Sequence, residues 1–156
     1  MRRPTWRLPE SAPWLPTLRL VREGPRQEGA RRITGAPGVY GVLQPYFERE
    51  PVEVFWILML DTQGKLIGDA PVEITRGIIN STLVHAREVF RPAIMAGASA
   101  IVVAHNHPSG EVQPTVDDDQ ITKQLREAGA MLDLPVKDHV IIGNGRYYSY
   151  AEQGRS

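Results

Sequence analysis

Two unbroken runs of apolar, strand-forming residues, 53–60 and 99–104, restrict the fold of this chain more than any other feature. Each run is long enough to form a buried strand and too short to cross a membrane as a helix. Apolar positions recur at helical spacing over 37–47, 86–96 and 115–130. Strands interspersed with helices within 156 residues predict one α/β domain of the α+β type, with a mixed sheet flanked by helices.

Turn residues predict two hairpins. Asp61-Thr-Gln-Gly64 is expected to turn the first apolar run into a second strand that starts near Lys65. Asn144-Gly145 is typical of a type I′ turn between two strands. The remaining predicted strand segments are 72–79, 136–142 and 146–150.

The beginning of the chain differs from the rest in composition. Five prolines and many arginines occur there without apolar periodicity, so we expect an extended or poorly ordered arm over 1–36 and the domain over 37–156. Residues 1–32 hold eight arginines and three glutamates, a net charge of +5. Such an arm either aids solubility or contacts nucleic acid or another partner, and Trp6 and Trp14 could stack on bases.

The chain has no cysteine, which excludes disulfides, thiol nucleophiles and cysteine-ligated metals. Histidines and carboxylates are then the strong metal ligands on offer. No apolar segment approaches the ~18 residues of a membrane span, and the start lacks a secretion-signal pattern. We therefore expect a cytoplasmic protein without a membrane partner.

The segment after the second apolar run carries the chemistry: His105-Asn-His107-Pro-Ser-Gly110. Because side chains alternate along an extended strand, His105 and His107 point to the same side, about 6–7 Å apart along the chain. A helix that opens near Thr115 can bring a carboxylate of its first turn back to the two imidazoles. Two histidines and one carboxylate leave an open position on a tetrahedral zinc ion, as in catalytic sites.

Other interpretations of the same segment stay open. Thr115 and Asp118 fit a helix capping box, which needs no metal. A cupin-like site that adds Glu111 to the two histidines has suitable spacing, although cupins are all-β and the flanking segments here are helical. Two other metal motifs are excluded: a metallo-β-lactamase motif would need an aspartate in place of Ser109, and an amidohydrolase barrel needs about 250 residues.

Three further polar residues have expected roles. Asn106 should face away from the two neighbouring imidazoles, and we expect it to fix the loop by hydrogen bonds. His139 lies in a predicted strand far from the motif and is expected to be structural or to support a metal ligand from behind. His85 has no partner that the sequence identifies.

A motif and several shorter segments together indicate a family. The pattern H-x-H-P, followed at fixed spacing by a hydroxyl residue and an aspartate, selects His105, His107, Pro108, Thr115 and Asp118. Further similar segments are Glu53–Trp56, Leu60–Thr62, Arg87–Phe90, Ile121-Thr122, Asp138–Gly143 and Gly145–Tyr147. On these residues the chain from Val39 to Gln153 resembles the C-terminal domain of the RadC family, a bacterial branch of the JAB/MPN fold with the JAMM motif. The resemblance implies the cytidine-deaminase-like architecture of that fold.

The resemblance also implies an activity. It points to a zinc-dependent hydrolase of JAMM type that cleaves an amide, peptide or isopeptide bond in a peptide or protein conjugate. Zn²⁺ would be held by His105, His107 and Asp118 and would lower the pKa of its water toward ~7. The alternative is a DNA-associated RadC-like module, acting in repair, as a nuclease or by DNA binding through residues 1–32, with a secondary or vestigial metal site. Retention of all three ligands argues against a third class, a non-catalytic scaffold.

Catalytic roles follow from the same resemblance. Glu53, just before a predicted strand, matches the family's general base, and Glu88 is the second candidate. Thr115 stands where the family has a serine that stabilises the oxyanion, and Ser109 is a second hydroxyl donor. The added methyl of threonine restricts χ1 and can shift the aim of the hydroxyl.

Overall fold

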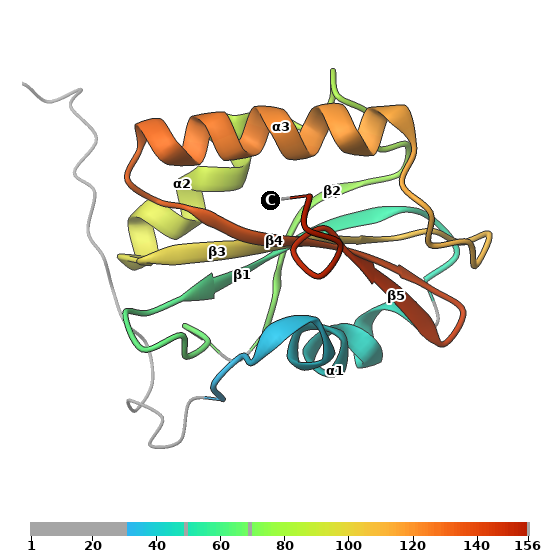
Figure 1. The fold of residues 1–156 in the computed structure, drawn as a ribbon, viewed down its shortest axis with the longest axis horizontal. Coiled ribbons are helices and arrows are strands. Elements are labelled where there is room, and N and C mark those ends of the chain that lie inside the picture. The colour runs from blue at the N-terminus through green and yellow to red at the C-terminus, as the bar shows by residue number, and fades with distance from the viewer. Residues whose placement is uncertain (1–30, 49, 69, 156) are drawn as a thin grey trace, which may run out of the picture.

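The computed structural model describes residues 31–48, 50–68 and 70–155, so the expected arm lies outside the described residues up to residue 30. The described part forms a five-stranded sheet and three helices (Figure 1). None of these helices combines the length and the apolar content needed to cross a membrane. The elements are, in chain order, α1 (Gly35–Phe47), β1 (Val54–Leu60), β2 (Val72–Arg76), α2 (Ala86–Ala96), β3 (Ala100–Asn106), α3 (Val116–Met131), β4 (Val136–Gly143) and β5 (Arg146–Ser149).

The sheet is mixed and carries helices on both faces, which confirms the predicted α+β architecture. The strand order is β2-β1-β3-β4-β5, with β3 and β4 parallel and the other neighbours antiparallel. Helix α1 covers one face, and α2 and α3 cover the other (Figure 1). Because α3 connects the parallel strands β3 and β4, its first turn lies near the carboxyl end of β3, where α/β sheets commonly bind ligands.

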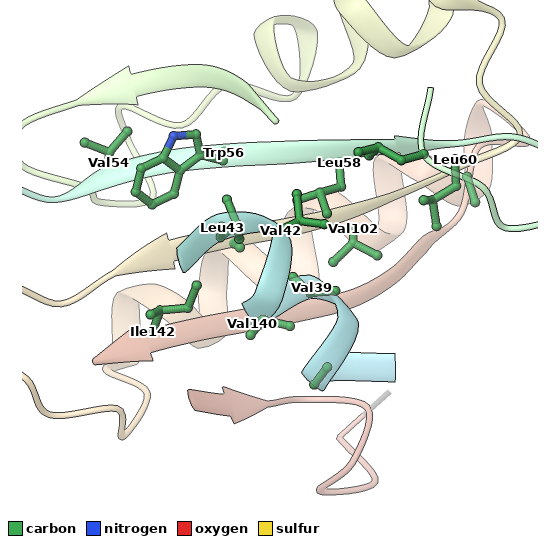
Figure 2. Packing of buried hydrophobic residues seen from close by; sticks show 14 residues of the cluster. Val39, Val42, Leu43, Val54, Trp56, Leu58, Leu60, Val102, Val140 and Ile142 are labelled. Atoms are coloured by element: carbon green, nitrogen blue, oxygen red, sulfur yellow. The ribbon is translucent and has the colours of Figure 1, made fainter. Parts of the chain in front are cut away.

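Strand β1 is apolar along its whole length because its alternate side chains serve both faces of the sheet. Trp56 and Leu58 pack with Leu43 of α1, as Figure 2 shows. Phe55 and Ile57 belong to the second core, under α2 and α3. Burial of each such side chain stabilises the fold by about 1.5–3 kcal/mol. This burial fixes a strand whose first residues lie beside His105.

The predicted turn after β1 is confirmed, but the second strand expected to start near Lys65 is limited to isolated bridges. The Asp61 carboxylate accepts the amide protons of Gln63 and Lys65 at 2.8 and 2.9 Å. Leu66 then forms only an isolated bridge with the end of β1, and Gly68, at φ +85°, ends the extended backbone. The strand that pairs with β1 on the side opposite β3 is β2.

Residues 31–36 of the expected arm contact the domain. The amide of Ile33 donates to the carbonyl of Gly64 at 3.0 Å, and the amide of Leu66 donates to that of Arg31 at 2.9 Å. The side chain of Ile33 packs on the core under α1. The helix itself begins at Gly35, two residues before the predicted start.

The β4–β5 hairpin is confirmed, whereas the predicted type I′ turn is wrong. That turn needs positive φ at both central residues. Gly145 has φ +69°, but Asp133 is the only non-glycine residue with positive φ in the described part of the chain. The amide of Asn144 donates to the carbonyl of Gly110 at 3.4 Å, so contact with the loop after the histidines accompanies the different turn.

Candidate metal centre

The three predicted ligand residues converge at the carboxyl end of β3. His105 continues the row of β3 side chains that faces α3, His107 follows the strand, and Asp118 lies in the first turn of α3. Nε2 of His105 lies 2.9 Å from Nε2 of His107 and 3.0 Å from Oδ1 of Asp118. Nε2 of His107 lies 3.5 Å from Oδ2 of Asp118.

These separations fit a single metal ion. A tetrahedral zinc ion with bonds of about 2.0–2.1 Å holds its ligand atoms about 3.3–3.4 Å apart, and the three distances here run from 2.9 to 3.5 Å. His105 and Asp118 are buried, and His107 is partly exposed, so one side of the group faces solvent. The three side chains could hold a metal ion.

The protonation of His107 supports this arrangement. Its Nδ1 lies 2.7 Å from the backbone carbonyl of Glu111. A carbonyl only accepts, so Nδ1 carries a proton, and in the neutral ring the lone pair is on Nε2, the atom that faces His105 and Asp118. The carboxylate of Glu111 is instead exposed, 3.9 Å from the guanidinium of Arg146, so the cupin-like ligand set does not form.

The pKa values of His107 and Asp118 depend on the contact between the two side chains. Burial by itself would lower the pKa of His107, but hydrogen bonds with Asp118 and the Glu111 carbonyl raise it above the ordinary 6.5. Burial would raise the pKa of Asp118, but its contacts with the imidazoles of His105 and His107 hold it well below the ordinary value. Asp118 is therefore ionised and suited to bind a cation.

The capping box and the ligand group coexist, although the sequence presented them as alternatives. Oδ2 of Asp118 accepts the Thr115 amide at 2.7 Å and the Thr115 hydroxyl at 2.8 Å. Oγ1 of Thr115 in turn accepts the Asp118 amide at 3.2 Å. Oδ1 remains directed at His105. The cap thus orients the carboxylate whose other oxygen faces the imidazoles.

A buried group supports His105 from behind. Nδ1 of His105 lies 2.9 Å from Nε2 of His139, which is fully buried in β4. Burial lowers the pKa of His139 well below its ordinary value, so its ring is neutral. Nδ1 of His139 meets the Thr122 hydroxyl at 2.6 Å. Sequence reasoning gave Thr122 no role, although its position one helical turn after Asp118 was a usable signal.

The strand register brings Glu53 to this site. Phe55 pairs with His105 across the antiparallel strands, and extending that register by two residues sets Glu53 opposite His107. Burial lowers the pKa of His107, the contacts with Asp118 and the Glu111 carbonyl raise it, and the charge of Glu53 adds a smaller contribution that also raises it. Its Oε2 accepts the amide proton of Ile79 at 3.0 Å.

Asn106 holds the peptides on both sides of Glu53. Its Oδ1 accepts the amide proton of Val54 at 2.8 Å, and its Nδ2 donates to the carbonyl of Val52 at 2.9 Å. This is the expected loop-fixing role, directed at the chain segment that carries Glu53. Glu88, by contrast, pairs with two arginines of its own helix, Arg91 at 2.8 Å and Arg87 at 3.3 Å.

The remaining candidates lie around the opening of the site. Ser109 is exposed, and its Oγ accepts the amide proton of Glu111 at 3.4 Å, a bond that does not use its hydroxyl proton. A groove of about 510 Å³ runs from His107 and Ser109 to Tyr40 and Phe47 of α1. His85 is exposed before α2 and lies outside the ligand group.

Fold and site together define a class: an α+β domain in which two histidines at the end of a central strand and a helix-capping aspartate face one another closely enough to bind one metal ion. A family model described as RadC-like JAB domain matches residues 33–155. The chain belongs to this family, which confirms the resemblance seen in the sequence.

Several curated relatives agree with this assignment. The chain is similar to a UPF0758 protein of Rubrobacter xylanophilus, 42% identical over 129 residues, which cover 83% of this chain and 56% of the relative. UPF0758 proteins of Methanococcoides burtonii and Flavobacterium johnsoniae are 40% and 38% identical, each over 80% of this chain and 53% of the relative. The chain thus spans about half the length of these relatives.

Proposed function

We propose that this domain is a zinc-dependent hydrolase of JAMM type that cleaves an amide, peptide or isopeptide bond, and that it works in the cytoplasm. The observation that carries the proposal is the close approach of His105, His107 and Asp118, with their electron-pair donors directed at one another and one side open. Nitrogen and oxygen ligands in this number suit zinc with a free position. A bound zinc ion supplies Lewis acidity and lowers the pKa of its water toward about 7.

Glu53 is the general base of the proposed reaction. One carboxylate oxygen is held by the Ile79 amide, which leaves the other to take a proton from the attacking water and pass it to the leaving amine. Its position opposite His107 in the extended register supports this role. Glu88 is the weaker candidate because its carboxylate pairs with the arginines of α2.

Two hydroxyls are available to stabilise the oxyanion. The Thr115 hydroxyl donates to Asp118, so its proton would have to leave that bond to reach a substrate oxygen. Ser109 lines the same groove as His107, and its proton is not taken up by its bond with Glu111. We therefore assign the main donor role to Ser109 and an orienting role to Thr115.

The groove beside His107 suits an extended substrate. It is bounded by aromatic side chains of α1 on one side and by the loop at Ser109 on the other. A peptide or a protein conjugate, with an amide in an extended segment, fits a groove of this kind. The acyl carbon of that amide would approach the site from the exposed side of His107.

Paired substitutions test the proposal. His107→Ala should lose both zinc and cleavage, whereas Glu53→Gln should keep zinc and lose turnover, measured with quenched fluorescent peptides and isopeptide-linked lysine conjugates. Glu88→Gln is the matched control and should cleave at the parent rate. Equal turnover in Glu53→Gln and the parent would remove Glu53 as the base. Zinc-loaded protein that cleaves no probe of either kind would contradict the hydrolase assignment.

A further inference from the structure

We infer that His139 and Thr122 form a buried positioning relay that fixes the tautomer of His105 and thereby presents its Nε2 to the metal. The inference rests on the metal site of the proposed function, but not on any hydrolase activity. It concerns a chain of three hydrogen bonds that ends at the backbone carbonyl of Asp118.

Thr122 determines which atom donates and which accepts in each hydrogen bond of the relay. Its Oγ1 lies 2.6 Å from the carbonyl oxygen of Asp118 and 2.6 Å from Nδ1 of His139. The carbonyl can only accept, so the single hydroxyl proton goes to Asp118. Oγ1 must then accept from His139, and Nδ1 of His139 carries the proton.

The protonation of His139 in turn determines which nitrogen of His105 carries a proton. It is fully buried in β4, where a charged imidazolium would lose its hydration. A neutral ring with its proton on Nδ1 has a lone pair on Nε2, which lies 2.9 Å from Nδ1 of His105. Nδ1 of His105 therefore donates, and the lone pair of His105 is on Nε2, the atom 3.0 Å from Asp118.

Packing holds the relay in place. The ring of His139 stacks on Tyr150 with centroids 5.2 Å apart and an interplanar angle of 8°, and Phe55 meets it edge-on at 5.7 Å. The opposite tautomer of His105 would set two lone pairs against each other at His139. It would also place an N–H on Nε2, where a metal ion needs a lone pair. The relay also ties two ligands together, because Thr122 is bonded to the backbone of Asp118.

The test is zinc affinity in threonine variants, measured by competition with a chromophoric chelator. Thr122→Val keeps the shape of the side chain but removes the acceptor, and we expect zinc binding to weaken by about 10–100-fold. Thr122→Ser restores the hydroxyl and should bind within about threefold of the parent. Thr75→Val is the matched control, because the buried Thr75 hydroxyl has no hydrogen-bond partner among the described residues.

A second measurement separates positioning from general destabilisation. Two-dimensional NMR of the imidazole nitrogens should show protonated Nδ1 on His105 in the parent and in Thr122→Ser, and a changed or mixed pattern in Thr122→Val. Parent-like zinc affinity in Thr122→Val, or equal losses in Thr122→Val and Thr75→Val, would overturn the relay alone. A parent protein that binds no zinc would overturn the metal site, and a parent that binds zinc without cleaving amides would overturn only the proposed function.

Discussion

Replacing Asn106 by alanine should destabilise the fold and impair turnover while leaving zinc bound. The amide side chain is buried and makes two hydrogen bonds, to the amide of Val54 and the carbonyl of Val52. Val54 is fully buried, so its N–H would lose its partner without gaining water, whereas Val52 is partly solvent-exposed. Two lost hydrogen bonds and one buried orphan donor amount to about 2–4 kcal/mol.

Urea denaturation gives the free energy of unfolding, and zinc content and peptide cleavage are measured on the same preparations. We expect Asn106→Ala to keep parental zinc content, since the hydrogen bonds of the Asn106 side chain go to Val52 and Val54 and not to the ligands. Turnover should fall because Glu53 is no longer held. Asn144→Ala, at an exposed turn, is the control and should change stability by less than about 0.5 kcal/mol. Unchanged stability in Asn106→Ala, or a loss of zinc as large as the loss of turnover, would refute the reasoning.

Three further outcomes are expected. Thr115→Ala should lose about 1 kcal/mol of stability through the missing helix cap and bind zinc more weakly because Asp118 loses a donor. Thr115→Ser should keep both the stability and the zinc affinity of the parent, and equal denaturation midpoints of Thr115→Ala and the parent would contradict this. Because the pKa of His107 is raised above 6.5, protons compete with the metal below that pKa, so the zinc-induced rise in melting temperature should be larger at about pH 8 than at about pH 6; a pH-independent rise would count against His107 as a ligand. Deletion of residues 1–30 should leave zinc affinity and amide cleavage unchanged, and a steeply salt-dependent DNA affinity that disappears with the deletion would favour the DNA-associated alternative.

The local sequence was sufficient to predict the strands and the helix that surround the site. The unbroken apolar character of β1 and β3 reflects burial on both faces, and the strand-end position of His105 and His107 follows from it. The box formed by Thr115 and Asp118 marked the start of α3 within one residue. These features depend on residues close in sequence, which is why periodicity and capping patterns could predict them.

The predictions that failed depend on contacts between distant segments. The segment at Lys65 and Leu66 pairs with residues 31–33 on one side and with only the last residues of β1 on the other. The turn at Asn144 lies beside the carbonyl of Gly110. The contact between His139 and His105 arises from the parallel pairing of β3 with β4, whose register no local pattern reveals. The contacts of the side chains that support the site from behind could therefore be identified only in the structure.

Elemental analysis combined with X-ray absorption at the zinc edge tests the metal site most directly. The parent protein, purified without chelator and supplied with zinc, should bind a single ion per chain with two imidazole nitrogens and a carboxylate oxygen in its inner coordination. Asp118→Asn and His107→Ala should each lose most of that zinc. A parent that retains no zinc, or variants that retain as much as the parent, would contradict the assignment of His105, His107 and Asp118 as its ligands.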